Sequence, residues 1–169
     1  MNSKTLARIE RMGLKMGAFP LRAGTMHDLP IVLKFYLAYL EEMEHVTLTP
    51  HIVHVAAMSV QEVLSNNGGL AMMCEDNGIV VGCYCCQLLH ERLTDGMYVQ
   101  VFPLYVLPNY RTLGVGEQLV VKMVEYAKSR NATRIAFMET PEECSKWIER
   151  LGGRISLVEY EIPLCETGE

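Results

Sequence analysis

Residues 101–120 read Val-Phe-Pro-Leu-Tyr-Val-Leu-Pro-Asn-Tyr-Arg-Thr-Leu-Gly-Val-Gly-Glu-Gln-Leu-Val and join the end of a strand to the start of a helix. A strand is predicted over 97–106, Pro108 turns the chain, and helical spacing follows. Gly114 and Gly116 let backbone N–H groups approach an anion where the helix dipole adds attraction. The stretch therefore predicts a pyrophosphate-binding loop, with an ordinary strand-turn-helix connection as the alternative.

Two other glycine-loop motifs do not fit this stretch. A P-loop requires Gly-Lys-Ser/Thr, and none follows here. A dinucleotide fingerprint requires a further glycine before Gly114 and a place early in the chain. Pro103 stands inside the predicted strand and supplies no ladder donor, so we expect a β-bulge close to it.

Apolar periodicity and turn residues predict the remaining elements. The expected elements are a helix over 3–16, a strand over 18–22, helices over 29–43 and 59–65, strands over 70–75, 79–90 and 97–106, a helix over 113–130, a strand over 133–139, a helix over 141–151 and a strand over 154–162. Their order and the lack of repeats predict one α/β domain with a mixed sheet over 18–169, preceded by a helical extension over 1–17.

Composition and charge exclude several classes of protein. The chain has 169 residues, of which 50% are hydrophobic, and this is enough for one folded core. Residues 1–25 carry a net charge of +4, and residues 26–169 therefore carry −9 of the total −5. An acidic protein is not expected to bind nucleic acid in general, and an acidic body suits a cationic acceptor, although solubility alone also explains it.

The same composition predicts a cytoplasmic protein that does not enter a membrane. No apolar run approaches the ~20 residues that cross a bilayer. The first residues, Met-Asn-Ser-Lys, have no apolar h-region, so the six cysteines are expected to be free thiols.

The loop and the element order together resemble the GNAT superfamily of N-acetyltransferases. Arg-x-x-Gly-x-Gly at Arg111–Gly116 is similar to the acyl-CoA-binding motif of that family, and Ser-Lys-Trp-Ile-Glu-Arg-Leu-Gly at 145–152 resembles its late helix-and-glycine segment. The resemblance implies a GNAT fold, α/β of the α+β type. Its mixed, mostly antiparallel twisted sheet would be flanked by helices, here with an extra N-terminal helix.

The resemblance also implies which residues bind acetyl-CoA. Those expected around the pyrophosphate, mainly through backbone amides and with the Arg111 side chain near the phosphates, are Arg111, Thr112, Leu113, Gly114, Val115 and Gly116. Leu104 and Val106 would bind the pantetheine arm through backbone groups, and one amide would polarise the thioester carbonyl. The family usually transfers acetyl by direct attack of an amine, with a base and an acid to move protons.

The proton-transfer residues depart from the family pattern. The tyrosine that often serves as acid aligns with Ile148, and a glutamate base of some members aligns with Gln100. Gln100 can orient a water but cannot take a proton at neutral pH. The candidate catalytic residues are Gln100 and Tyr105. Further substitutes are Tyr98, His90 and Glu139, for which packing or solvation is the alternative. An amine can lose its proton to water, so these departures do not exclude turnover.

No metal site is expected. Cys83 and Cys86 have CxxC spacing, but they lie in an apolar strand on which Cys83 and Cys85 share one face, and no second pair has zinc spacing. Buried structural thiols are therefore predicted.

Two polar groups near the helices are expected to lie in solvent. His51 and His54 are placed in a polar link before the helix over 59–65, with a metal pair or a substrate contact as the alternative. The acidic residues Glu41, Glu42 and Glu44 are placed at a solvated helix end, with attraction of a cationic acceptor as the alternative.

The sequence predicts an acetyl-CoA-dependent N-acetyltransferase that acts on a primary amine, either a small molecule or a protein lysine or N-terminus. One alternative is a catalytically weak or inactive CoA-binding or protein-interaction module with the same fold, which the residues at 100 and 148 favour. Another is an acyltransferase for a longer acyl group. The N-terminal helix is a candidate for docking in a homodimer.

Overall fold

The computed structural model describes residues 19–43, 45–91 and 95–137. The chain divides into two compact units, Met1–Glu139 and Thr140–Glu169, and the described residues belong to the first. Its elements are β1 (Leu21–Ala23), η1 (Met26–Asp28), α2 (Leu29–Met43), α3 (Pro50–Ser65), β2 (Gly69–Asp76), β3 (Ile79–His90), β4 (Met97–Val106), η2 (Pro108–Tyr110), α4 (Val115–Ser129) and β5 (Arg134–Phe137). The elements predicted over 3–16, 141–151 and 154–162 lie outside the described residues.

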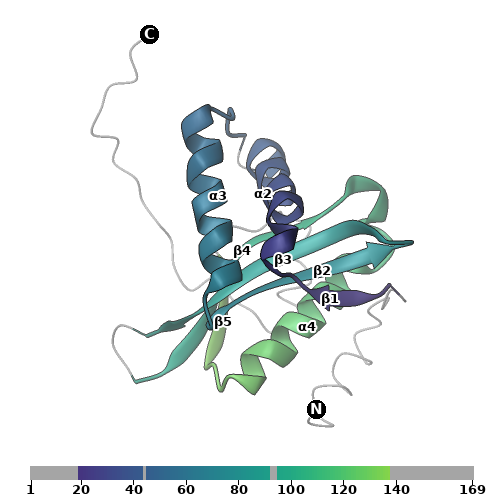
Figure 1. Cartoon of the computed structure of the whole chain (residues 1–169). Helices are drawn as coiled ribbons and strands as arrows, with labels where there is room; N and C mark the ends of the chain where they lie inside the picture. Colours follow the sequence, from purple (N-terminus) through teal and green to yellow (C-terminus); the bar gives the residue numbers. More distant parts are fainter. Residues whose placement is uncertain (1–18, 44, 92–94, 138–169) are drawn as a thin grey trace. The chain divides into compact units, whose positions relative to one another are not determined.

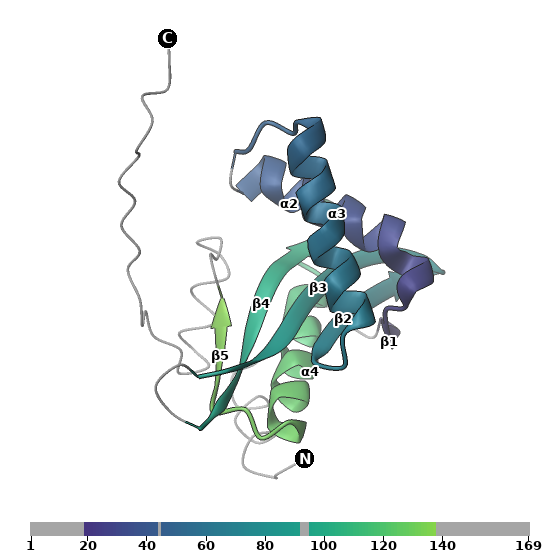
Figure 2. The same cartoon turned by 60° about the vertical axis from the view of Figure 1, so that its left-hand side comes forward.

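The five strands form one sheet in the order β1-β2-β3-β4-β5. The first three pairs are antiparallel, and β4 pairs with β5 in parallel. The parallel pair needs a crossover, which α4 supplies. Helices α2 and α3 cover one face of the sheet and α4 covers the other (Figures 1 and 2). The prediction of a mixed, mostly antiparallel sheet flanked by helices is confirmed.

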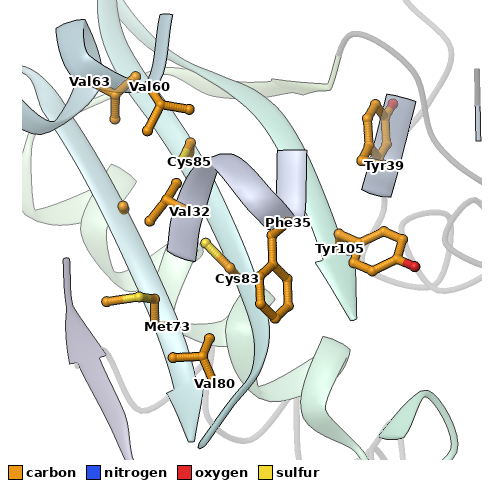
Figure 3. Close-up of a cluster of buried hydrophobic side chains, with 11 residues drawn as sticks. Val32, Phe35, Tyr39, Val60, Val63, Met73, Val80, Cys83, Cys85 and Tyr105 are labelled. Atoms are coloured by element: carbon orange, nitrogen blue, oxygen red, sulfur yellow. The ribbon is translucent and has the colours of Figure 1, made fainter. Parts of the chain in front are cut away.

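The face under α2 and α3 holds a cluster of buried apolar side chains (Figure 3). Its members include Val32 and Phe35 of α2, Val60 of α3, and Cys83 and Cys85 of β3. These side chains exclude water from one side of the sheet, which fixes its register because a slip of one residue would expose them. The cluster extends along β4 to Tyr105, whose ring meets that of Phe35 edge to face at 6.0 Å between centroids.

On the opposite face, α4 lies close to β3. A Cβ atom at Gly82 would come within 2.7 Å of Val115 Cγ1 and 3.1 Å of Leu119 Cδ1, so only a glycine lets the first turn of α4 approach this closely. Val115 and Leu119 are fully buried in this contact. The close approach fixes the N-terminus of α4 against the sheet.

The bulge predicted near Pro103 is confirmed in β4. Tyr84 pairs with Leu104 and Cys86 pairs with Val101, so β4 uses one residue more than β3 over this interval. The extra residue reverses the alternation of side chains along the rest of the strand. As a result Tyr105 faces α2, while Leu104 and Val106 face α4.

The prediction of a short second helix over 59–65 is wrong, because α3 begins at Pro50. Thr49 is its N-cap and accepts a hydrogen bond from the Ile52 N–H at 3.3 Å, while Pro50 occupies the first turn, where its missing N–H costs nothing. His51 and His54 therefore lie on an exposed part of the first turns of a helix and not in a link.

The described cysteines are free and buried, as predicted. They are Cys74, Cys83, Cys85 and Cys86. Burial raises the pKa of Cys86 to about 12 and that of Cys74 to about 11, so both stay protonated at neutral pH. In the part of the chain that the structure describes, no three His, Cys, Asp or Glu side chains gather as a metal site would require. No helix in that part is long and apolar enough to cross a bilayer.

Candidate functional site

The loop between β4 and α4 turns tightly before the helix begins. It carries the short η2 helix, and the Leu113 N–H donates to the Tyr110 carbonyl at 3.1 Å. Gly114 then takes a left-handed conformation, with φ 82° and ψ 11°, as the N-cap of α4. The Gly114 carbonyl accepts the first helical hydrogen bond, from the Gln118 N–H at 3.1 Å. Because the first N–H groups of an α-helix have no acceptor within the helix, this end can receive an anion.

Gly116 lies in the first turn of α4, where the fold itself does not need a glycine. A Cβ atom there would lie 3.9 Å from Val106 Cγ2, which is an ordinary van der Waals contact. Its φ is not positive, so an alanine would meet no backbone strain. The fold would tolerate alanine at this position of the helix, so its own packing does not explain the glycine. The missing side chain leaves room for a ligand to approach the helix backbone.

The end of β4 turns backbone groups away from its partner strand. The Leu107 N–H donates to the Val81 carbonyl at 2.9 Å, and Tyr105 pairs with Cys83. Residues of an antiparallel pair alternate between those that bond the partner and those that do not. The N–H and C=O groups of Leu104 and Val106 therefore point away from β3, toward the side of the sheet on which β5 pairs with the first half of β4.

The structure places both candidate catalytic residues on the face of β4 that α2 covers. The Gln100 amide donates to the Ala136 carbonyl of β5 at 3.4 Å. The Tyr105 hydroxyl donates to Glu42 Oε2 at 2.5 Å, and burial followed by this hydrogen bond raises the pKa of Tyr105. A strand rises about 3.3 Å per residue, so the two backbones lie roughly 15 Å apart. They cannot both contact one reacting atom.

Glu42, which was expected from the sequence at a solvated helix end, makes two side-chain contacts in this region. It lies in the last turn of α2. Its Oε1 forms an ion pair with Arg111 Nη1 at 2.6 Å, and its Oε2 accepts the hydrogen bond of the Tyr105 hydroxyl. The Arg111 hydrogen bond, and then that of Tyr105, lowers the pKa of Glu42. The prediction of a merely solvated helix end is therefore wrong for Glu42.

Arg111 makes two further contacts from its place in the loop. Its Nε donates to the Val106 carbonyl at 3.0 Å, and its guanidinium carbon lies 5.3 Å from the centroid of the Tyr105 ring. Beside it, the Tyr110 hydroxyl donates to Asp76 Oδ2 at 2.9 Å. Successive residues thus attach the loop to the end of α2 and to the turn between β2 and β3.

Comparison with known families decides what this fold and loop belong to. The model of the family described as "Acetyltransferase (GNAT) family" matches residues 33–146, which include most of α2, the strands β2 to β5, the loop and α4. The chain belongs to the acetyltransferase (GNAT) family. The resemblance inferred from Arg111–Gly116 is thereby confirmed.

Solved structures of other acetyltransferases share the fold. A predicted acetyltransferase from Clostridium acetobutylicum, determined with acetyl-CoA, is 17% identical with a TM-score of 0.76, and the match covers 86% of this chain and 96% of that one. A ribosomal-protein-alanine N-acetyltransferase from Brucella melitensis biovar Abortus 2308 is 17% identical with a TM-score of 0.67, and the match covers 88% of this chain and 100% of that one.

A third solved structure with this fold is that of an aminoglycoside acetyltransferase. An aminoglycoside acetyltransferase from an uncultured soil metagenomic sample, determined with sisomicin, is 13% identical with a TM-score of 0.66. The match covers 87% of this chain and 97% of that one.

Membership of the GNAT family supports acyl transfer as the chemistry of this protein. The residues that the resemblance implies for cosubstrate binding, Arg111–Gly116, Leu104 and Val106, lie within the described structure. Ile148, which aligns with the usual acid, and Glu139, one of its proposed substitutes, lie outside the described residues. The described candidates for proton transfer are therefore Tyr98, Gln100 and Tyr105 of β4 and His90, the last residue of β3.

Proposed function

We propose that this GNAT protein is an acetyl-CoA-dependent N-acetyltransferase that transfers an acetyl group directly to a primary amine. The observation that carries the proposal is the left-handed Gly114 at the start of α4, directly after the strand end that turns its backbone groups outward. Both features serve one extended cosubstrate, a pyrophosphate and the arm attached to it. The acetyl-CoA complex of the clostridial acetyltransferase supports this choice of cosubstrate.

Each half of the cosubstrate has a place in this scheme. The backbone amides of Arg111–Gly116 surround the pyrophosphate at the helix N-terminus. The outward N–H and C=O groups of Leu104 and the N–H of Val106 pair with the amides of the pantetheine arm, as a neighbouring strand would, while the Val106 carbonyl accepts from Arg111 Nε. An N–H donor of β4 at the thioester oxygen stabilises the oxyanion, and such a donor is worth about 3 kcal/mol in the transition state.

The reaction balances without an acyl-enzyme. The neutral amine attacks the thioester carbonyl carbon, a C–N bond forms, and the C–S bond breaks to release CoA. One proton leaves the ammonium for water oriented by Gln100, and one returns to the thiolate. The proposed acid is the phenol of Tyr105, which is protonated at neutral pH as in any tyrosine and whose pKa is raised further by burial and by its hydrogen bond to Glu42.

The acceptor is proposed to be an amine that is cationic in solution. Residues 26–169 attract such a molecule, because together they carry a net charge of −9. Acceptors named for the structural relatives, a ribosomal-protein alanine and an aminoglycoside, both present amines. A small amine and a protein lysine or N-terminus therefore make up the substrate class to be tested.

A specific observation favours the alternative of a CoA-binding module with little or no turnover. The Gln100 amide and the Tyr105 hydroxyl are both engaged by other protein groups, the Ala136 carbonyl and Glu42. Neither is poised toward an open position. This state fits a protein that binds the cosubstrate and transfers acetyl slowly or not at all.

Binding and turnover separate the two proposals. Calorimetry with CoA and acetyl-CoA comes first, followed by thiol release on a panel of a polyamine, an aminoglycoside, a lysine peptide and a peptide with N-terminal alanine. Binding with thiol release supports the enzyme, and Tyr105→Phe is then expected to lower kcat by ~100-fold if its phenol is the acid. Binding without release across the panel supports the module. Absence of binding would contradict both.

Gly116→Ala is expected to move stability and affinity in opposite directions. The methyl group raises helix propensity by ~0.5–1 kcal/mol and meets no close contact within the fold. It occupies the space over the helix N-terminus and is expected to weaken CoA binding by ~10-fold, about 1.4 kcal/mol. Thermal unfolding and calorimetry on the same samples provide the check. A stabilised variant with unchanged CoA affinity would show that the pyrophosphate lies elsewhere.

A further inference from the structure

We infer that Arg111 and Glu42 form a clamp that sets the position of the cosubstrate loop, and that the Arg111 side chain acts through Val106 and α2 and not by contact with phosphate. The inference rests on the proposed function, because it assigns a role within the same site. Arg111 and Glu42 are positioning residues in this scheme. The resemblance to the family, taken alone, places the Arg111 guanidinium near the phosphates, whereas its contacts in the structure are with Glu42 and Val106.

Two donors of the guanidinium, Nε and Nη1, bind groups of the fold outside the N-terminus of α4. Arg111 Nη1 meets Glu42 Oε1 at 2.6 Å, and Arg111 Nε meets the Val106 carbonyl at 3.0 Å. The group also lies over the ring of Tyr105. A planar guanidinium with several fixed donors can hold these partners at once, which a lysine ammonium at the end of a flexible stem cannot do.

Glu42 occupies a position that a helix does not favour for an acid. The C-terminal end of a helix is its negative end, so a carboxylate in the last turn of α2 is destabilising unless it is paired. Here both carboxylate oxygens are paired, one with Arg111 and one with Tyr105. The pairing fixes the Glu42 side chain although it is 37% exposed.

The clamp acts on Val106, a residue of β4 that is proposed to bind the pantetheine arm of the cosubstrate. Val106 carries backbone groups that point away from β3, and Arg111 occupies its carbonyl. Its N–H remains directed outward for a ligand, while the carbonyl bond fixes the plane of the following peptide. The same guanidinium also forms an ion pair with Glu42 at the end of α2. Glu42 therefore fixes the distance between the end of β4, which is proposed to bind the pantetheine arm, and the loop that is proposed to bind the pyrophosphate.

Lysine and glutamine at position 111 distinguish a clamp from a phosphate contact. In the clamp, Arg111→Lys and Arg111→Gln both weaken CoA binding by ~10-fold, because lysine cannot replace the fork of donors. In a direct phosphate contact, Arg111→Lys keeps the affinity within ~3-fold, because lysine binds phosphate as a point charge. Glu42→Gln is expected to weaken CoA binding by ~5-fold in the clamp and to leave it unchanged or tighter if Arg111 serves the phosphates.

Two further measurements separate positioning from general damage. The exchanged pair Glu42→Arg with Arg111→Glu is expected to bind CoA more tightly than Arg111→Glu alone, whereas a phosphate-binding arginine could not be rescued from position 42. The salt dependence of the CoA Kd is expected to be unchanged in Arg111→Gln, because no contact with phosphate has been lost.

A second ion pair of the chain provides the matched control. Arg134 and Glu91 are joined at 2.6 Å at the opposite end of β4, with an arginine side chain that is more exposed than that of Arg111. Glu91→Gln is expected to leave CoA affinity unchanged. Thermal unfolding identifies any variant that fails to fold. Among the folded variants, the CoA affinities of Arg111→Lys and Arg111→Gln then distinguish the clamp from a phosphate contact. Wild-type affinity in Arg111→Lys would overturn the clamp, whereas absence of CoA binding by the wild type would overturn the proposed function itself.

Discussion

Gly114→Asp is expected to weaken CoA binding by ~100-fold or more, the largest functional effect of a single substitution in this protein. Gly114 has φ 82°, a conformation that aspartate and asparagine tolerate better than other residues. The aspartate would place a negative charge at the helix N-terminus proposed to receive the pyrophosphate. Repulsion at about 4 Å is worth up to ~4 kcal/mol in a partly screened environment, and ~2.7 kcal/mol already gives 100-fold.

Gly114→Asn provides the matched control for this substitution. Asparagine has nearly the same shape and the same tolerance of the left-handed conformation, but it carries no charge. We expect it to weaken CoA binding by only ~10-fold, through the added side chain. Calorimetry with CoA gives both values, and circular dichroism checks the fold. Equal affinities for the two variants would mean that no anion approaches this helix end.

Gly69→Ala is expected to lower the free energy of unfolding by ~3 kcal/mol or more, the largest effect on stability. A Cβ atom at Gly69 would come within 2.0 Å of the Val63 carbonyl oxygen and within 2.9 Å of Val63 Cα, both of which are backbone atoms. Neither can move as a flexible side chain would. The chain folds back at this point from α3 into β2, so the clash forces the two elements apart. The expected fall in Tm is ~6–12 °C.

Gly78→Asn tests whether this effect comes from the clash or from loss of glycine itself. Gly78 has φ 80° in the turn between β2 and β3, and a Cβ atom there has no heavy atom within 4 Å. Asparagine tolerates this conformation, so we expect a change within ~1 kcal/mol. Denaturant unfolding of the two variants and the wild type measures the difference. A loss at Gly69 no larger than that at Gly78 would contradict the packing of β2 on α3.

The elements predicted most accurately from the sequence are those in which the apolar periodicity and the turn residues at the ends indicate the same helix or strand. The predicted bounds of α2, β3 and β4 match the structure, and Pro103 predicted the bulge that orients the end of β4. In each of these segments, periodicity and turn residues point to the same structure. Local rules therefore sufficed.

The start of α3 was missed although the sequence contains its cap. Thr49 and Pro50 are a favourable N-cap and first residue, but the polar His51 and His54 that follow resemble a loop. The spacing of Ala56, Val60 and Val63 marks only the second half of the apolar face. Packing of that face on α2 and β2 stabilises a helix whose first turns have little apolar pattern of their own.

Glu42 could not be assigned from sequence, because its partners lie far along the chain. It continues the stripe of Phe35 and Tyr39 at helical spacing, which would have indicated a carboxylate turned toward the sheet. Nothing in the sequence names Arg111 and Tyr105 as the groups that meet it there. That choice depends on how α2 crosses β4.

The sequence by itself determined the family, the order of the described elements, the strand that bulges and the loop that opens a helix with Gly114, because each depends on residues within a few positions of one another. Only the tertiary structure decided that the bulge turns Tyr105 toward α2, and that Arg111 bonds Glu42 and Val106. The physical reason is that a charged side chain takes the partners that folding brings within 3 Å of it. Glu42 lies more than sixty residues from both Tyr105 and Arg111, so the packing of α2 on the sheet decides whether they meet.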